Sequence, residues 1–321
     1  MAHKKLLQDE TLAKKLITKG FWVYFFAFFS APIGYILRMF LSNTVSVAEV
    51  GVFYSVLGLM GLISSYNDLG LTEAMQYFIP KFWIKGEKAK VRLVIFVSFF
   101  MQLLTGILIF FLLYSGADWL ALHHFHDPLA AQILKILAFY FFGLNIITLC
   151  STMFVSFQDT FSQGLVNAIQ QVVNLVFTVV FWATASLTIV SYAWVWIIGV
   201  VTAIVTGVSI VVLKYREVFK CEQGGTSSLF SITTGFSKIG TSTLKQHFKY
   251  ALRVFLVANV ASLLGQVDQQ VVVNVLGPES AGLFSNFQAL LMVFILVVTP
   301  LFGLLFPLTT ELITKKDTQK F

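Results

Sequence analysis

Charged residues are scarce in this sequence: Asp, Glu, Lys and Arg make up only 12% of its 321 residues. A soluble domain carries about 25%, and hydrophobic residues, at 57%, take up the difference. Apolar side chains in such a surplus cannot all be buried in one core surrounded by water, so many of them must face lipid. The composition excludes an ordinary soluble protein and predicts an integral membrane protein.

Cysteine is also scarce, and the two residues present do not predict a disulfide. Cys150 lies in an apolar run and Cys221 in a basic loop, which places them in different compartments. The N-terminal segment, 1–19, is polar and basic, without the early apolar region and small-residue cleavage site of a signal peptide. We therefore expect this segment to be retained and to lie in the cytoplasm.

The motifs of catalysis and nucleotide binding are missing. The sequence has no GxxxxGKS/T phosphate-binding loop, no HExxH and no GxSxG. His123, His124 and His126 cluster with Asp127, but adjacent histidine side chains diverge, so we expect no metal site. We predict a protein that is not an enzyme and needs no cofactor. Any energy for transport would come from a gradient, the substrate or a partner.

Long apolar runs are what the sequence does have. A helix of about 20 apolar residues crosses the hydrocarbon core of a bilayer. By this length we predict an all-α, polytopic membrane bundle of about eight transmembrane helices. The predicted spans are 20–41, 47–66, 93–114, 133–154, 165–186, 191–213, 252–275 and 282–306.

Lysine and arginine predict the orientation. With the N-terminus inside, the cytoplasmic segments contain 20 of the 22 basic residues, and only Arg38 and Lys135 lie elsewhere. Cytoplasmic loops of membrane proteins carry such an excess. We predict a multi-pass protein of the cytoplasmic membrane with both termini in the cytoplasm. The net charge of +7 thus reflects topology, and no nucleic-acid partner is expected.

A basic segment rich in Gly, Ser and Thr, 214–250, predicts a cytoplasmic linker between two bundles. The first bundle, 20–213, has six predicted helices. The second, 251–310, has two, and a cytoplasmic tail, 311–321, follows it. Segment 68–92 is amphipathic and basic, and it predicts a helix lying on the membrane surface.

Two stretches of the sequence repeat one pattern. AEVGVFYSVLGLMGL (48–62) and ESAGLFSNFQALLMV (279–293) both place an acid, a glycine and an aromatic residue in the same order. Transporters are often built from internal repeats. Within the first stretch four small residues predict a ridge for close helix packing, namely Gly51, Ser55, Gly58 and Gly61.

Polar side chains within a span are destabilising in lipid, so they usually face a cavity or another helix. At about 100° per residue, such residues fall on one face of the fifth predicted span and one face of the seventh. The fifth-span stripe is Gln163, Asn167, Gln170, Gln171, Asn174 and Thr178, and the seventh-span stripe is Asn259, Ser262, Gln266, Gln269, Gln270 and Asn274. We predict that the fifth-span stripe lines a water-filled lumen, with interhelical hydrogen bonding as the alternative.

Two charged residues lie inside predicted spans. Arg38 shares a face of the first span with Tyr24 and Tyr35, and a kink is expected at Pro32. The guanidinium either clamps a phosphate or carboxylate or extends to the outer water boundary. Asp268 lies opposite the seventh-span stripe. It is interpreted either as an ion-coupling carboxylate or as a residue at that boundary.

The run GVFYSVLGLMGLISSYNDLGLTEAMQYFIPKF (51–82) resembles the polysaccharide flippases of the multidrug/oligosaccharidyl-lipid/polysaccharide exporter superfamily. The residues that carry the resemblance are Arg38, Gly51, Phe53, Gly70, Leu71, Ala74, Phe78, Ile79 and Pro80, and LGPESAGLFSNF (276–287) looks like the second-half counterpart. The resemblance implies a transporter that flips a lipid-linked oligosaccharide, a polysaccharide precursor, by alternating access through a polar lumen. It implies that Arg38 and the two polar stripes line this lumen, that the protein contacts membrane lipid, and that polysaccharide assembly proteins are candidate partners.

The number of spans departs from that family, whose members have about twelve to fourteen helices. The eight predicted spans correspond to the first half and the first two helices of the second. Two alternatives therefore stay open beside the flippase. One is a cation-coupled multidrug-type exporter that uses Asp268, and the other is a truncated, non-transporting membrane subunit.

Overall fold

The computed structural model describes residues 2–216 and 241–314. Side chains are described for 20–64, 66–216, 243–256 and 266–291. Most of the predicted linker and of the predicted C-terminal tail thus lies outside the described residues. The division into two bundles stays a prediction.

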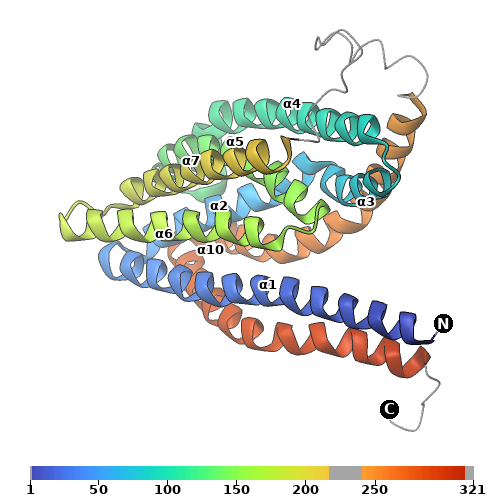
Figure 1. The fold of residues 1–321 in the computed structure, drawn as a ribbon. Helices are drawn as coiled ribbons and strands as arrows, with labels where there is room; N and C mark the ends of the chain where they lie inside the picture. The colour runs from blue at the N-terminus through green and yellow to red at the C-terminus, as the bar shows by residue number, and fades with distance from the viewer. Residues whose placement is uncertain (1, 217–240, 315–321) are drawn as a thin grey trace.

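The described residues form helices and no strand, which confirms the all-α fold (Figure 1). The elements are α1 (Ala2–Thr44), α2 (Val47–Asp68), α3 (Leu71–Ile84), α4 (Lys88–Leu120), the short π-helix η1 (Ala121–Phe125), α5 (Leu129–Ser156), α6 (Thr160–Ala183), α7 (Ile189–Lys214) and α10 (Thr241–Thr314). α5 lies at the centre, packed on α4, α7, α3 and α2, whereas α1 packs chiefly on α6.

Six helices among the described residues are long and apolar enough to cross a membrane, and they coincide with the first six predicted spans. They are Gly20–Thr44, Val47–Asp68, Lys88–Phe125, Leu129–Ser156, Thr160–Ala183 and Ile189–Lys214. α10 covers the last two predicted spans. Its helical backbone is interrupted at Gly277, where φ is 86° and ψ is 175°. This break lies between the predicted spans 252–275 and 282–306.

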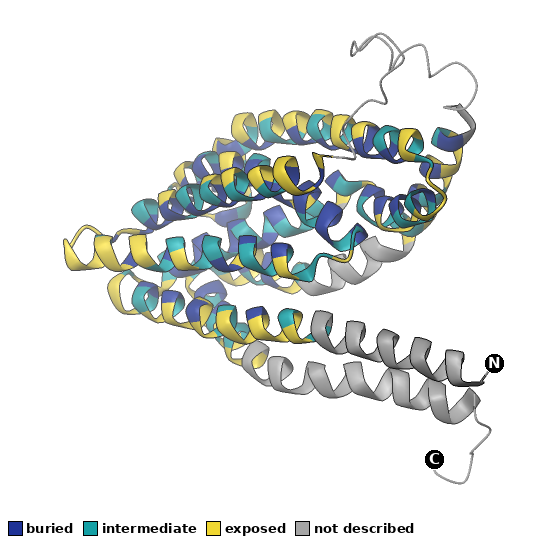
Figure 2. Ribbon diagram, viewed as in Figure 1, coloured by how far each residue is buried: buried dark blue, intermediate teal, exposed yellow. Residues whose placement is uncertain are grey.

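Figure 2 shows exposed residues along the outside of the bundle, and many of the exposed residues are large and apolar. Phe28 of α1, Phe111 of α4 and Val205 of α7 are 76%, 63% and 62% exposed. An apolar surface of this extent is unfavourable in water and suits contact with lipid tails. The protein is a multi-pass membrane protein.

α2 ends in a sharp turn that directs the chain into α3. Leu69 and Gly70 both have positive φ, 51° and 72°, a region that residues other than glycine rarely adopt. A β-carbon on Gly70 would lie 2.2 Å from the carbonyl oxygen of Ala251 in α10. This turn therefore requires glycine for its backbone conformation and for the close approach of α10.

The prediction of a helix within 68–92 is confirmed by α3, and its apolar face is covered by protein rather than by lipid. Leu71, Met75 and Ile79 on its apolar face are buried, because α3 packs against α4, α5 and α10. The amphipathic pattern of a helix predicts that its apolar face is shielded from water, but it does not show whether lipid or protein covers that face.

α2 and α10 form the most extensive helix pair of the bundle. Gly51 lies against the backbone of Pro278 and Gly282, and Gly282 lies in turn against the carbonyl oxygen of Val47. The two copies of the sequence repeat thus pack on each other through their glycines. Farther along α2, Gly58 lies against the Gln270 side chain. The predicted packing ridge is confirmed.

Asp159 joins the start of α6 to the end of α7, outside the spans. Its carboxylate accepts hydrogen bonds from Lys214 Nζ, from the Tyr215 hydroxyl at 2.9 Å and from the Ser162 amide at 3.3 Å. Partial burial raises the pKa of Asp159, but these hydrogen bonds outweigh it, so the pKa lies below its usual 3.8. The stabilisation is present above the unfolded pKa of about 3.9 and is lost as the pH falls through the folded value.

We expect Asp159→Asn to lower the free energy of unfolding at pH 7 by about 1 kcal/mol or less, since Lys214 is half exposed and solvent screens the pair. Thermal unfolding at pH 7 and pH 3 measures this, and the difference between variant and wild type should shrink at pH 3. Asp118→Asn, which breaks the exposed pair with Lys135, is the control and should change little at either pH. A constant difference at both pH values would contradict the prediction.

Two adjoining cavities as the candidate functional site

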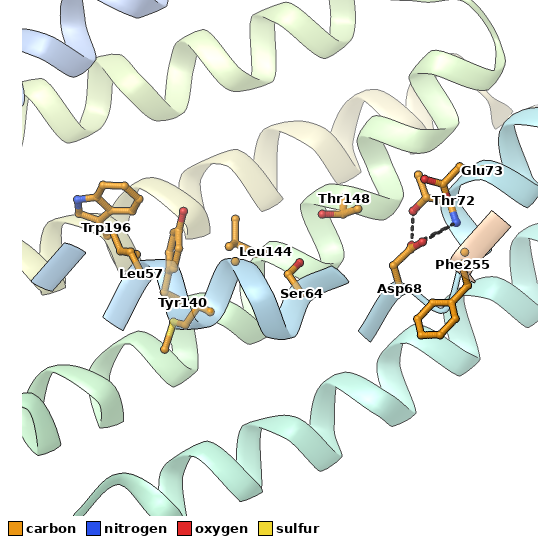
Figure 3. A pocket seen from close by; sticks show the side chains of 13 residues that line it. Leu57, Ser64, Asp68, Thr72, Glu73, Tyr140, Leu144, Thr148, Trp196 and Phe255 are labelled. Carbon is orange, nitrogen blue, oxygen red and sulfur yellow. Dashed lines mark hydrogen bonds between the residues drawn. The ribbon is translucent and has the colours of Figure 1, made fainter. Parts of the chain in front are cut away.

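A cavity of about 500 Å³ lies between α2, α3, α5, α7 and the start of α10. Figure 3 shows Trp196 and Tyr140 toward one end of its lining and the two acidic residues, with Phe255 beside them, at the other. The aromatic end has Leu57, Tyr140 and Trp196, and the acidic end has Asp68, Thr72 and Glu73. We call this space the acidic cavity.

The acidic end is fixed by the sharp turn between α2 and α3. Asp68, the last residue of α2, accepts hydrogen bonds from the Thr72 amide and hydroxyl. Gln102 of α4 is 1% exposed and donates from Nε2 to Asp68 Oδ1 at 2.6 Å. Glu73, in the first turn of α3, lies close enough to interact with Asp68 electrostatically. Two carboxylates thus stand together where one span ends.

A second cavity, of about 390 Å³, lies between α3, α5 and α6, and we call it the amide cavity. Its α6 wall consists of Gln163, Asn167, Gln170, Gln171 and Asn174. Five residues of the predicted fifth-span stripe therefore share one cavity. The sixth, Thr178, is buried and donates to the Asn174 carbonyl oxygen at 2.7 Å.

The two cavities adjoin. Thr72, Tyr140, Leu144, Thr148 and Trp196 line both. The Tyr140 hydroxyl is within hydrogen-bonding reach of Gln170, which links the aromatic wall to the amide stripe. Together the cavities combine apolar walls with a set of polar side chains, and a mostly apolar lining with a few polar groups is the usual form of a small-molecule binding site.

Arg38 lies apart from both cavities. Its Nε donates to Asn286 Oδ1 at 2.9 Å and its Nη2 to Ser285 Oγ at 2.7 Å. The guanidinium carbon stands 3.9 Å from the centre of the Tyr54 ring. In this arrangement Arg38 joins α1, α2 and α10. Its predicted role in a lumen stays a prediction.

Tyr24 and Tyr35, the other first-span candidates, also line neither cavity. Their side chains are 47% and 39% exposed on α1, a helix that packs mainly on α6. Of the seventh-span candidates, Asp268 is exposed. Asn259 lies outside the residues whose side chains are described.

The described part of the seventh-span stripe makes interhelical contacts. Gln270 donates to the Ser55 carbonyl oxygen at 2.8 Å and accepts from His124 Nε2 at 3.0 Å. Gln269 donates to Ser55 Oγ at 2.8 Å, and Gln266 packs on the glycine ridge of α2. None of these three glutamines lines either cavity.

The histidine-rich η1 belongs to the same contact. His124 interacts with Gln270 and Asn274, and His126 Nε2 lies 3.1 Å from the Asn274 carbonyl oxygen. Among the described residues, no group of three His, Cys, Asp or Glu side chains is placed to hold a metal. These histidines instead attach η1 to the middle of α10, just before its break at Gly277.

Sequence reasoning missed Asp68, Glu73, Tyr140 and Trp196 as cavity residues. The carboxylates lie at a helix boundary, where acidic residues are common. The aromatic side chains lie in spans already rich in aromatic residues. The one signal available was the position of Asp68 as the last residue of an apolar run.

Comparison with known proteins gives three kinds of match. The profile of the family described as "Polysaccharide biosynthesis protein" matches residues 16–313. The "Uncharacterized membrane protein MJ1068" of Methanocaldococcus jannaschii is 26% identical over 155 residues, which cover 45% of this chain and 31% of that protein. The chain thus spans about a third of the curated relative that it matches.

Solved structures share the fold. One is the inward-facing conformation of a multidrug resistance MATE family transporter of the MOP superfamily, with TM-score 0.62 and 17% identity over 85% of this chain and 58% of that one. Another is a MOP superfamily transporter from Pyrococcus furiosus Vc1, with TM-score 0.62 and 16% identity over 87% and 60%. An outward-facing MATE family structure has TM-score 0.53 and 15% identity over 91% and 70%. At these identities the likeness shows the fold, and the chain spans about three fifths of the first two structures.

Proposed function

Because the chain belongs to the polysaccharide biosynthesis protein family, whose fold neighbours are transporters and not enzymes, we propose that it flips a lipid-linked oligosaccharide across the cytoplasmic membrane. The chain spans only about three fifths of the first solved neighbours. We therefore propose that its six-helix bundle, 20–213, supplies one wall of the pathway.

The observation that carries the proposal is the amide stripe of α6 lining a cavity. Gln163, Asn167 and Gln170 offer both donors and acceptors, which suit the hydroxyl and acetamido groups of a sugar. The outside of the bundle is apolar, so the carrier-lipid tail can stay in the bilayer while the sugar enters the cavities. The polysaccharide assembly proteins that supply and remove such a lipid would be its partners.

The position of the cavities supports alternating access. Both cavities extend from Trp196 toward the α2–α3 turn and the start of α6, which face the cytoplasm in the predicted orientation. Beyond the Leu57 end of the acidic cavity, Gly51 of α2 is in close contact with Pro278 and Gly282 of α10. Export would require α2 and α10 to separate at this contact.

A flipping assay tests the proposal. The chain is reconstituted in liposomes that carry a fluorescent lipid-linked oligosaccharide, and a membrane-impermeant quencher reports the label in the outer leaflet. We expect label in the inner leaflet to become accessible. Replacing Gln163, Asn167 and Gln170 together by leucine should slow this by about tenfold or more, since each lost hydrogen bond removes about 1 kcal/mol.

The control places leucine on the lipid-facing side of the same helix, at Val172, Val176 and Val180, which are 37%, 52% and 49% exposed. This triple variant should flip lipid like the wild type. If the inner-leaflet label stays protected from the quencher with wild-type protein, flipping by this chain is refuted. If both triple variants flip lipid at the same rate, the amide stripe has no part in flipping.

The second candidate is a cation-coupled exporter of small amphipathic compounds. The MATE neighbours share the fold of this chain. Asp68 and Glu73 place carboxylates in a cavity. In this alternative Asp68, rather than the exposed Asp268, would be the coupling candidate. Efflux of a cationic dye from proteoliposomes under a sodium or proton gradient, without flipping of the lipid, would favour it.

A further inference from the structure

We propose that the two adjoining cavities select an uncharged oligosaccharide and reject one that contains acidic sugars. This inference rests on the proposed function and names the class of glycan. It follows from the charge of the cavity walls, from the chemistry of the amide stripe, and from the places where the nearby cations are bound.

The first observation is the sign of the charge on the walls. Among the residues that line either cavity, the charged ones are Asp68 and Glu73, and the lining contains no Lys, Arg or His. Both are carboxylic acids that line the same cavity, so the charge that the walls can carry is negative. The carboxylate of a uronic acid in the adjoining space would be repelled by this charge, since no cation of the lining balances it. The apolar helices around the cavities strengthen this repulsion.

The second observation is that Asp68 cannot turn away from the cavity. The Thr72 amide and hydroxyl hold it at the turn, and Gln102 Nε2 holds Oδ1 at 2.6 Å from the opposite side. Gln102 is 1% exposed and Asp68 itself ends a helix. The negative charge is thus fixed in position, as a feature that excludes a ligand must be.

The third observation concerns the neutral wall. Gln163, Asn167 and Gln170 present amides that donate and accept hydrogen bonds without net charge. Tyr140 and Trp196, at the junction of the cavities, offer flat apolar faces to the C–H face of a sugar ring. A hydroxylated, uncharged sugar ring thus finds hydrogen-bond partners on the α6 wall and flat apolar partners at the junction of the cavities.

No described lysine, arginine or histidine lines either cavity, and two described cations bind other groups. Lys214, which lies near the start of α6, pairs with Asp159. Arg38 donates to Ser285 and Asn286. The phosphate linkage of the carrier lipid, which needs positive charge, therefore lies outside the two cavities, and the sugar alone enters them.

The test compares two tetrasaccharides of equal length on the purified full chain in lipid nanodiscs. One is the uncharged tetramer of N-acetylglucosamine and the other is tetragalacturonate, and intrinsic tryptophan fluorescence reports binding. We expect the uncharged tetramer to bind about tenfold or more tightly. In the double variant Asp68→Asn, Glu73→Gln the ratio should approach one, because tetragalacturonate binds better.

Glu73→Gln alone keeps the Asp68 hydrogen bonds, so it stands in if the double variant does not fold, and it should lower the ratio in part. Asp118→Asn removes an exposed carboxylate that pairs with Lys135 and should leave the ratio unchanged. Equal or tighter binding of tetragalacturonate to the wild type would overturn the proposal. Binding of neither tetramer, or a ratio that neither carboxylate variant changes, would also overturn it.

The flipping assay separates this result from the proposed function. Preferential binding of the uncharged tetramer by a chain that flips no lipid would retain the glycan preference and refute flipping. Flipping of a lipid-linked acidic glycan as fast as an uncharged one would retain flipping and refute the preference.

Discussion

Replacing Gly51 with alanine is expected to lower the stability of the protein by about 3 kcal/mol or more. The new β-carbon would lie 1.9 Å from the Pro278 carbonyl oxygen and 2.6 Å from the Gly282 nitrogen. Both are backbone atoms of α10, so relief requires the helices to move apart. Overpacking of this kind commonly costs about 1–3 kcal/mol, and here it acts on the most extensive helix pair. Thermal unfolding of the purified chain in detergent measures the change.

Gly116→Ala in α4 is the matched control, since nothing lies within 4 Å of its new β-carbon. Alanine is the better helix former by about 1 kcal/mol, so this variant should be at least as stable as the wild type. Gly282→Ala should reproduce the loss from the other side, because its β-carbon would lie 2.1 Å from the Val47 carbonyl oxygen. A Gly51→Ala protein as stable as Gly116→Ala would show that the two helices are not held this closely.

Removing Arg38 should detach α1 from α10. Arg38→Ala loses the hydrogen bonds to Ser285 and Asn286 and the stacking on Tyr54. Hydrogen bonds from a charged donor contribute about 1.5–3 kcal/mol each, and partial exposure reduces this, so we expect a total loss of about 3 kcal/mol. Arg38→Lys should restore only part, because an ammonium cannot reproduce the planar fork that reaches two acceptors. Thermal unfolding provides the stability measurement.

The same variants decide between the two interpretations of Arg38. If Arg38 joins helices, Arg38→Ala lowers stability, and flipping falls only with the amount of folded protein. If its main role is to clamp a phosphate, the variant stays stable and flipping is lost. Lys135→Ala removes a cation from an exposed pair with Asp118 and should change stability by less than about 1 kcal/mol.

The spans and the α6 stripe could be predicted because each depends on one helix alone. Length and apolar content define a span, and the helical repeat places Gln163, Asn167 and Gln170 on one face whatever packs beside them. The break at Gly277 falls in the gap between the predicted spans 252–275 and 282–306, where the apolar pattern is interrupted.

What the sequence left open depends on the identity of the partner helix. The α10 glutamines form a stripe like that of α6, yet they pack on the glycine ridge of α2. Only the position of α2 distinguishes the two stripes. For the same reason α3 was assigned to lipid, and Tyr140 and Trp196 could not be told from other aromatic side chains within the spans.

The glycine contact between α2 and α10 has a consequence for how the chain is made. Gly51 and Gly282 are separated by about 230 residues, and translation adds about 5–20 residues per second. For about 10–50 s, therefore, the glycine ridge of α2 lies in the bilayer before the part of α10 that packs on it has been synthesised. Lipid or an insertion factor must cover this ridge in the interval. The docking of α10 displaces that lipid or factor and is a late step in the maturation of the bundle.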